Sequence, residues 1–254
     1  MSSLPDPARR LDLFPGPAAS PRQPDREADH CAGCYAPLAP APLPGSRYRS
    51  CGACGSARSS EPLEDCQDGY YFHAGHAATP AELTRRLSEQ RARGLGPHGP
   101  DGARLLVFGA GSGECLRAAS DQGLEASGLE CSPAAVERAR RAGSAARLWY
   151  LARFEFASPE RVGQGFDRLW LPDLLEHFER PAELLLPAAR LLRPGGLLFG
   201  TTLAEGAHPG APQYHRHLFS APGLYALLAR HGFEAPATWP AADDRLAFAA
   251  LRLG

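Results

Sequence analysis

Four cysteines near the start of the chain form two Cys-x-x-Cys pairs. Cys31 and Cys34 make the first pair, and Cys51 and Cys54 make the second after 16 intervening residues. Two such pairs can surround one zinc ion tetrahedrally with four thiolates, and this spacing is typical of a zinc ribbon. Four cysteine ligands leave no coordination position for a substrate. We therefore expect a structural zinc that supplies folding energy to a segment with little apolar core.

A glycine-rich turn after a short apolar run is the second chemical signal. Residues 105–108 read Leu-Leu-Val-Phe, and residues 109–113 read Gly-Ala-Gly-Ser-Gly. Glycine lets the backbone turn tightly and approach a ligand closely, and a helix that begins at Glu114 offers free N–H groups to a carboxylate. A dinucleotide-binding fingerprint requires a third glycine where Glu114 stands. The turn therefore disfavours a cofactor that carries a pyrophosphate.

An acidic residue follows this turn at the end of the next expected strand. Glu130 lies 21 residues beyond Gly109. A carboxylate at that position can accept two hydrogen bonds from the hydroxyl groups of a ribose. The alternative interpretation is a solvated charge at a strand end.

Positioning these residues requires strands and helices in alternation. From residue 103 onward apolar runs alternate with helical stretches, a pattern typical of βαβ units around a largely parallel sheet. The sequence therefore predicts an α/β fold. We expect strands at 104–108, 125–129, 148–151, 167–171, 197–201, 234–238 and 245–251, and helices from 114 and at 133–141, 181–192 and 221–231.

The composition divides the chain into four segments. Residues 1–28 are rich in proline, alanine and charge, and we interpret them as a flexible N-terminal arm. Residues 29–60 form the zinc ribbon. Residues 61–100 form a connector or lid with one helix at 80–93, and residues 101–254 form the large domain.

Motifs in the second half of the large domain indicate a family. Residues 166–178 read FDRLWLPDLLEHF, residues 190–196 read RLLRPGG, and residues 217–220 read HLFS. In order and spacing they resemble class I S-adenosylmethionine-dependent methyltransferases, most closely the branch of ubiquinone-biosynthesis O-methyltransferases and small-molecule methyltransferases. The resemblance covers about 150 residues. It implies a Rossmann-like methyltransferase sheet with helices on both faces, S-adenosyl-L-methionine as the cofactor, and methyl transfer as the activity.

The resemblance also implies a set of cofactor-binding residues. The glycine turn would face the methionine part of the cofactor, Glu130 would hold the ribose, and Asp173 would line the site near the methyl group. The full set is Gly109, Ala110, Gly111, Gly113, Glu130, Cys131, Arg153, Phe154, Leu171 and Asp173.

Two positions depart from the family pattern. Relatives often place an acidic residue after the third strand to meet the adenine, whereas this chain has Arg153 and Phe154. Backbone groups or stacking on Phe154 would have to replace that contact. After the fifth strand many relatives have Pro-Asn, and this chain has Thr202 and Leu203.

The cysteine ribbon also occurs in this family. Many bacterial members begin with a two-pair cysteine ribbon, followed by a paired-tyrosine segment and the catalytic domain. Tyr70 and Tyr71 match the second element. The resemblance implies that the connector folds over the active site, with Tyr71 as a lid or orienting group.

Histidines are the candidates for contact with the methyl acceptor. Methyl transfer from a sulfonium is an in-line displacement that depends mainly on positioning, and it needs a general base only when the acceptor loses a proton. His177 follows the fourth strand, and its alternative role is structural. His215 and His217 lie on the expected acceptor side, where the alternative is a surface loop. We expect His177, His215, His217 and Tyr71 to include the catalytic groups.

Charge and hydropathy limit the partners. The formal net charge is −1, and residues 1–60 hold seven arginines against five acidic residues, so nucleic-acid binding is not favoured. No apolar run approaches the length of a membrane span, and no secretion signal is visible. We expect a cytoplasmic protein acting on a small-molecule acceptor through O, N or C. An RNA or protein methyltransferase and a non-catalytic scaffold are the alternatives, and the oligomeric state stays open.

Overall fold

The computed structural model describes residues 29–42, 46–61, 78–95, 102–143, 148–151, 157–206 and 215–254. The N-terminal arm, Tyr70, Tyr71, Arg153 and Phe154 lie outside these ranges, so what the sequence predicts for them stays a prediction. Among the helices within these ranges, none combines the length and apolar character that crossing a bilayer requires.

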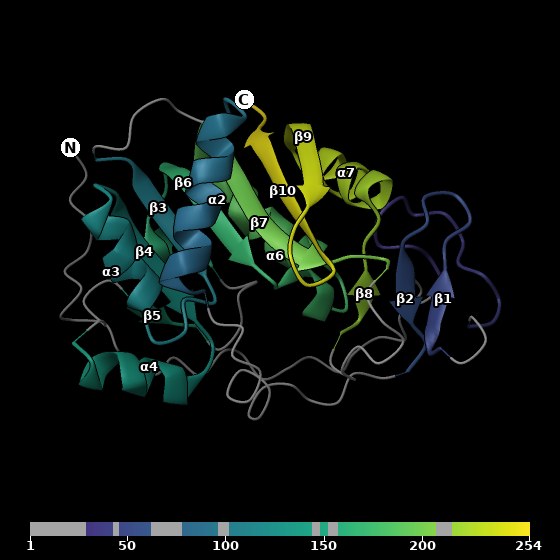
Figure 1. The fold of residues 1–254 in the computed structure, drawn as a ribbon, viewed down its shortest axis with the longest axis horizontal. Helices are drawn as coiled ribbons and strands as arrows, with labels where there is room; N and C mark the ends of the chain where they lie inside the picture. Colours follow the sequence, from purple (N-terminus) through teal and green to yellow (C-terminus); the bar gives the residue numbers. More distant parts are fainter. Residues whose placement is uncertain are drawn as a thin grey trace.

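A seven-stranded sheet with the order β5-β4-β3-β6-β7-β10-β9 forms the centre of the large domain (Figure 1). The strands from β5 to β7 run parallel, and β10 is antiparallel to both of its neighbours. This confirms the expected α/β class. The strands are β3 (Arg104–Phe108), β4 (Glu125–Glu130), β5 (Leu148–Tyr150), β6 (Phe166–Pro172), β7 (Leu192–Leu203), β9 (Phe233–Pro240) and β10 (Arg245–Arg252).

Helices cover both faces of this sheet. Along β3, Leu105 and Val107 join one hydrophobic core, and Leu106 and Phe108 join the other, because side chains alternate along a strand. The first core includes side chains of α2 (Pro80–Ala92), α3 (Glu114–Asp121) and α4 (Pro133–Arg141). The second includes side chains of α5 (Pro159–Val162), α6 (Ala182–Leu191) and α7 (Ala221–Arg230).

Three of these helices begin with the same local signal. A serine or threonine caps the helix and a proline follows within its first turn, which suits the fixed φ of proline. Thr79 caps α2, Ser132 caps α4, and Ser220 caps α7, and each side-chain oxygen accepts a hydrogen bond from a backbone N–H of the first turn. The helix predicted at 80–93 is therefore present, and it packs on α3.

The strand order reverses beside β3. From β3 the chain moves outward to β4 and β5, and it then crosses back to β6 on the other side of β3. Parallel sheets bind ligands at the carboxyl ends of the strands where such a reversal occurs. The glycine turn after β3, Glu130 at the end of β4 and Asp173 after β6 all lie at this edge.

The cysteine-rich segment forms a second sheet at one end of the molecule (Figure 1). Its strands β1 (Tyr48–Ser50) and β2 (Ala57–Ser59) form an antiparallel pair, and β8 (His217–Leu218) adds a third strand beside β2. The sequence suggests a surface loop after the fifth strand as the alternative for His215 and His217. The structure corrects that interpretation, because residues 217–218 pair with the edge of β2 and the side chains of His215 and His217 are buried.

Candidate active site

The glycine turn follows β3 in a conformation that favours glycine. Gly109, Gly111 and Gly113 have φ values of 73°, 57° and 76°, in the left-handed region where a Cβ atom is disfavoured. The N–H groups of Gly109 and Ala110 both donate to the carbonyl of Leu129, at 2.8 and 3.0 Å. These hydrogen bonds fix the turn against the end of β4, and Gly113 caps α3 directly after it.

Glu130 is the partner of this turn. One carboxylate oxygen accepts a hydrogen bond from the N–H of Gly111 at 2.8 Å, and the other accepts from the N–H groups of Cys131 and Ser132, also at 2.8 Å. Glu130 is 1% exposed, and burial raises its pKa against the opposing effect of these N–H groups. A carboxylate has about four acceptor positions. Three backbone N–H groups take three of these positions, so Glu130 keeps room to accept about one hydrogen bond from a ribose hydroxyl, and the turn and this carboxylate are compatible with an adenosyl cofactor.

Asp173 follows β6 on the other side of the strand reversal. Its φ of 46° is unusual for a residue with a side chain, and its N–H donates to the carbonyl of Thr201 at 3.0 Å. The guanidinium of Arg245 lies 3.0 Å from its carboxylate. Next in sequence, the side chain of Leu174 lies against Gly109. Leu174 therefore packs beside the glycine turn.

A buried group of polar side chains lies beyond Leu174. The short helix η4 (Leu175–His177) carries Glu176 and His177, and the imidazole of His215 lies 4.8 Å from that of His177, measured between ring centroids. The hydroxyl of Thr202 donates to Glu176 at 2.7 Å. Burial, followed by the negative charge of Asp173, raises the pKa of Glu176 to about 8.

This group offers two kinds of chemistry. Ligand atoms of Glu176, His177 and His215 all lie within 4.8 Å of one another, so they could hold a divalent cation. The same three side chains could also orient an acceptor or accept its proton. We name Glu176, His177 and His215 the acceptor cluster.

His217 lies apart from the acceptor cluster, at the junction with the ribbon. Its Nε2 atom is 3.3 Å from the carbonyl of Glu179. Arg58 and Arg216 each donate to the same carboxylate oxygen of Glu179 at 2.6 Å. Burial, together with the charges of these two arginines, lowers the pKa of His217 to about 3. The imidazole of His217 is therefore neutral at physiological pH.

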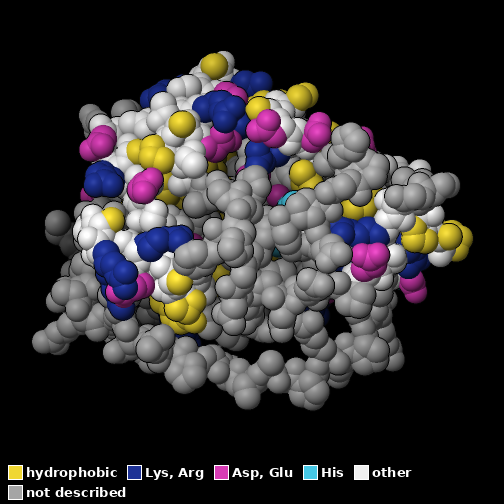
Figure 2. All heavy atoms as spheres, turned by 60° about the horizontal axis from the view of Figure 1, so that its bottom comes forward, with side chains coloured by type: hydrophobic (Ala, Val, Ile, Leu, Met, Phe, Trp, Pro, Cys, Tyr) yellow, Lys and Arg dark blue, Asp and Glu magenta, His cyan; other side chains and the backbone are white. Residues whose placement is uncertain are grey.

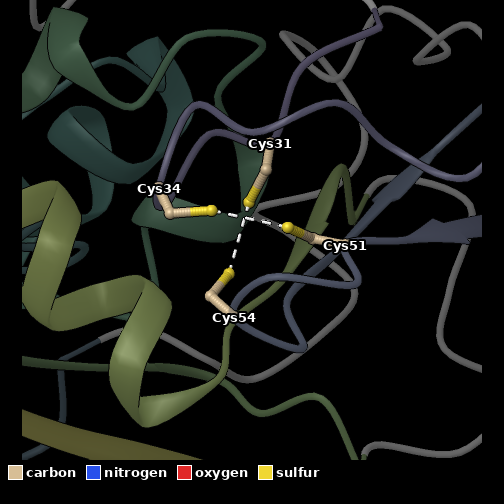
Figure 3. A group of neighbouring side chains, drawn as sticks. All are labelled: Cys31, Cys34, Cys51 and Cys54. Carbon is tan, nitrogen blue, oxygen red and sulfur yellow. Dashed lines mark hydrogen bonds between the residues drawn. The ribbon is translucent and has the colours of Figure 1, made fainter.

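The four predicted zinc ligands converge on one point (Figure 3). The Sγ atoms of Cys31 and Cys54 are 3.6 Å apart, those of Cys34 and Cys51 are 3.4 Å apart, and all four lie within 4.8 Å of one another. A tetrahedral zinc with Zn–S bonds of about 2.3 Å needs sulfur atoms about 3.8 Å apart. The donor set and its spacing therefore fit zinc.

The remaining predicted site residues are placed less directly. Ala110 lies within the glycine turn, and Cys131 follows Glu130 with its backbone N–H on that carboxylate. Leu171 is buried in the core of the sheet, where it pairs with Gly200. Contact of these three side chains with a cofactor stays a prediction.

Comparison with known proteins decides the family. A family model described as a methyltransferase domain matches residues 78–237, which is more than half of the chain. The chain belongs to this methyltransferase family. The match begins at α2 and includes both the glycine turn and the acceptor cluster, so it covers each part of the candidate active site in the large domain.

Curated relatives and solved structures agree with this family. The chain is 32% identical over 139 residues to 27-O-demethylrifamycin SV methyltransferase of Amycolatopsis mediterranei, which is 53% of this chain and 50% of the relative. It is 33% identical over 105 residues to ubiquinone biosynthesis O-methyltransferase of Xanthomonas oryzae, covering 40% and 44% of the two chains. The chain thus spans about half the length of the curated relatives it matches.

A solved structure shows the same fold in this methyltransferase family. Phosphoethanolamine N-methyltransferase 2 of Haemonchus contortus, in complex with S-adenosyl-L-methionine, aligns with a TM-score of 0.53 at 20% identity. The alignment covers 71% of this chain and 55% of that chain. The expected Rossmann-like methyltransferase sheet is therefore confirmed.

Several residues of the site give little or no signal in the sequence. Glu176 stands in the motif beside His177, but nothing in the pattern shows that it is buried. Thr202 was visible only as a departure from a family pattern, and its hydroxyl proves to be a donor to Glu176. Tyr48 gave no signal at all, yet its hydroxyl donates to the carbonyl of His215 at 3.0 Å.

Proposed function

We propose that this methyltransferase transfers the methyl group of S-adenosyl-L-methionine to a small-molecule acceptor. The hydrogen bond between the Gly111 N–H and Glu130 carries this proposal, because it joins the carboxylate that would bind the ribose to a turn that would face the methionine part of the cofactor. The acceptor cluster includes Glu176 and His177, which follow β6. Cofactor and acceptor would then approach each other at the carboxyl ends of β3 and β6.

The residues on the two sides would divide the work of the reaction. S-adenosyl-L-methionine, when bound, supplies a methyl group activated as a sulfonium. The glycine turn and Glu130 would hold the cofactor and fix the direction of the methyl group. On the other side, His177 and His215 would orient the acceptor. Where the acceptor atom carries a proton, the ionised form of Glu176, which its raised pKa makes the minor form at neutral pH, would accept that proton. A nucleophilic oxygen, nitrogen or carbon fits this division of roles.

The cysteine site would have a structural role in the same protein. Four thiolates form a closed coordination shell without a position for substrate, so a zinc ion there would stabilise the ribbon. We retain the four segments 1–28, 29–60, 61–100 and 101–254 and a cytoplasmic location as parts of the proposal. Tyr71 would belong to a lid over the active site.

Charge distribution favours a small molecule over a nucleic acid. On the face drawn in Figure 2, basic and acidic side chains are interspersed among those shown in colour. At the ribbon, Arg49 pairs with Asp29, while Arg58 pairs with Glu179. Such pairing reduces the basic surface that the described part of the ribbon offers to the phosphate backbone of RNA. The hydrogen bonds between Glu130 and the glycine turn speak against a protein that has lost cofactor binding.

Transfer of a labelled methyl group tests this function. The chain would be incubated with methyl-labelled S-adenosyl-L-methionine and fractions of a metabolite extract, with a total RNA sample and a protein lysate in parallel. We expect label in a low-molecular-mass fraction, and much less label at limiting cofactor when Glu130→Ala replaces the wild type. Label in RNA or protein alone would support the alternative substrate class. No label in any sample, at saturating cofactor, would contradict an enzymatic role.

A further inference from the structure

The ribbon and the catalytic domain share one sheet, and this has consequences for the active site. Within that sheet, Arg58 pairs with His217 and Ala57 pairs with Leu218. The N–H of Ser59 also donates to the carbonyl of Arg216 at 2.8 Å. The segment of residues 215–218 is thereby hydrogen bonded along the edge of the ribbon.

The same segment is bound to the acceptor cluster on its other side. The N–H of Arg216 donates to the carbonyl of Glu176 at 2.6 Å, and the His215 ring lies beside His177. From the ribbon, the Tyr48 hydroxyl donates to the carbonyl of His215 at 3.0 Å in a buried contact. His215 is 7% exposed. Its position is therefore set by hydrogen bonds to both partners of the segment.

The cysteine loops contact the catalytic domain directly. The hydroxyl of Ser220, the cap of α7, donates to the carbonyl of Cys54 at 2.5 Å, and the Ser220 N–H donates to the Ser56 hydroxyl at 3.0 Å. A Cβ on Gly33 would lie 2.8 Å from the backbone of Gly223. The loop between Cys31 and Cys34 therefore packs on the first turn of α7, where a residue larger than Gly33 does not fit.

The helix α7 also bonds to the first loop at its far end. Arg230 donates to the carbonyl of Ala32 at 3.0 Å and lies over the ring of Tyr35. Both cysteine loops thus touch α7, and their sulfur atoms converge on one point (Figure 3), with the Cys54 sulfur beside Gly223 in the first turn of that helix. A metal ion that joins the four sulfurs would fix the two loops relative to each other and, through them, Ser220 and β8.

We propose that the metal-loaded ribbon positions the acceptor side of the active site, with Tyr48 as the positioning residue that holds His215. This inference rests on the proposed function, because the proposed function assigns the cluster of Glu176, His177 and His215 to the methyl acceptor. The cofactor side stands apart, because in the described part of the chain the glycine turn and Glu130 hydrogen bond to each other and to Leu129, Cys131 and Ser132, all of which lie outside the ribbon. Metal binding at the cysteines is therefore coupled to the acceptor cluster and not to cofactor binding. Coupling of this kind is reciprocal.

Hydrogen exchange on the full chain tests the coupling. Zinc would be removed with a chelator, its loss measured by elemental analysis, and amide exchange followed by mass spectrometry. We expect exchange of the Arg216 and Ser220 amides to accelerate about tenfold or more, because the Ser220 N–H loses its fixed partner Ser56 and the segment of Arg216 loses the ribbon edge to which its carbonyl is hydrogen bonded. The amides of Gly109 and Ala110 should be unchanged, and added zinc should restore protection. Unchanged exchange at Arg216 and Ser220, or equal acceleration at all four amides, would overturn the proposal.

A variant that keeps all four thiolates gives an independent test. Tyr48→Phe removes only the hydroxyl, and Tyr225→Phe, at a half-exposed position on α7, is the matched control. Zinc content should equal that of the wild type in both. In Tyr48→Phe the imidazole resonances of His215 and His177 should shift, with that of His231 on the far end of α7 as the internal reference. Unshifted His215 and His177 resonances would overturn the role of Tyr48.

Neither test depends on catalysis. Exchange rates and imidazole resonances are measured on the protein without cofactor or acceptor, so failure of the proposed function would leave these results intact. Conversely, a protein that binds S-adenosyl-L-methionine normally and shows no coupling would remove this inference and leave the proposed function in place.

Discussion

The cofactor side and the acceptor side of this active site are built in different ways. On the cofactor side, the hydrogen bond that joins the glycine turn to Glu130 spans 19 residues, and its donor is a backbone N–H. On the acceptor side, the contact between Tyr48 and His215 spans 167 residues. The first site is encoded within one βαβ unit. The second needs the ribbon, β6, β7 and β8 to be assembled first.

This contrast predicts different sensitivities to mutation. A change near Glu130 should affect cofactor affinity and little else, because its partners are local. A change in the ribbon should affect stability and the acceptor cluster together. The four predictions below follow from this difference, in order of decreasing expected effect.

Loss of a zinc ligand should have the largest effect. Cys51→Ser removes one of four thiolates from a ribbon whose core consists of little more than its cysteines and Leu38. We expect the zinc content to fall to near zero and the Tm to drop by about 10 °C or more, since metal binding supplies folding energy. Cys131→Ser, outside the cysteine site, is the control. An unchanged Tm with lost zinc would show that the ribbon folds without metal.

Replacing Glu176 should separate turnover from cofactor binding. Glu176→Gln keeps the shape and the hydrogen bond from Thr202 but removes the proton-accepting carboxylate. We expect methyl transfer to fall about 100-fold or more when the acceptor must lose a proton, with cofactor affinity within about twofold of wild type. Turnover would be measured on the acceptor found in the extract screen. A loss of cofactor affinity equal to the loss of turnover would contradict this account, because Glu176 would then contribute to cofactor binding.

Replacing Glu130 should have a smaller effect, confined to the cofactor side. Glu130→Ala removes the acceptor of a predicted ribose hydrogen bond, and a hydrogen bond to a charged group is worth about 1.5–3 kcal/mol. We expect S-adenosyl-L-methionine affinity to fall about 100-fold, measured by calorimetry. Glu137→Gln, a half-exposed residue on α4, is the matched control. Equal affinities in the two variants would remove Glu130 from the cofactor site.

Protonation of His217 should give the smallest effect. Its pKa is lowered to about 3 in the folded protein, against about 6.5 in the unfolded chain. Below pH 6.5 the unfolded chain binds a proton that the folded protein does not bind. The free energy of unfolding should therefore decrease by about 1 kcal/mol per pH unit from pH 6 to pH 5.

His217→Gln should reduce this slope when both proteins are unfolded with urea at each pH. The comparison isolates the imidazole of His217, because all other titratable residues are the same in both proteins. An identical slope in the two proteins would show that His217 takes up a proton in the folded state.

Much of the cofactor side could be predicted from the sequence because its signals are local. Glycines at 109, 111 and 113 and the acidic residue at 130 each have a physical reason that a pattern reveals, and the structure joins Gly111 to Glu130 directly. The helix after Thr79 follows from a cap, a proline and two leucines in the same way. The α/β class follows from alternating apolar runs.

The acceptor side could be predicted only in part because burial and strand pairing are not local. The sequence places His177 and His215 as candidates, but it does not reveal that their rings meet or that Glu176 is buried beside them. The pairing of β2 with β8 joins segments that no periodicity connects. The strands of the ribbon are three residues or shorter, and so they carry no alternating pattern that a sequence could show.

Titration calorimetry with S-adenosyl-L-methionine tests the central claim most directly. The wild-type chain should bind about one cofactor per molecule, and chelation of zinc should change that affinity by less than about threefold, because among the described residues the hydrogen bonds of the glycine turn and Glu130 go to partners outside the ribbon. Absence of binding at millimolar cofactor in the zinc-loaded protein would contradict the claim that this is a working S-adenosylmethionine site.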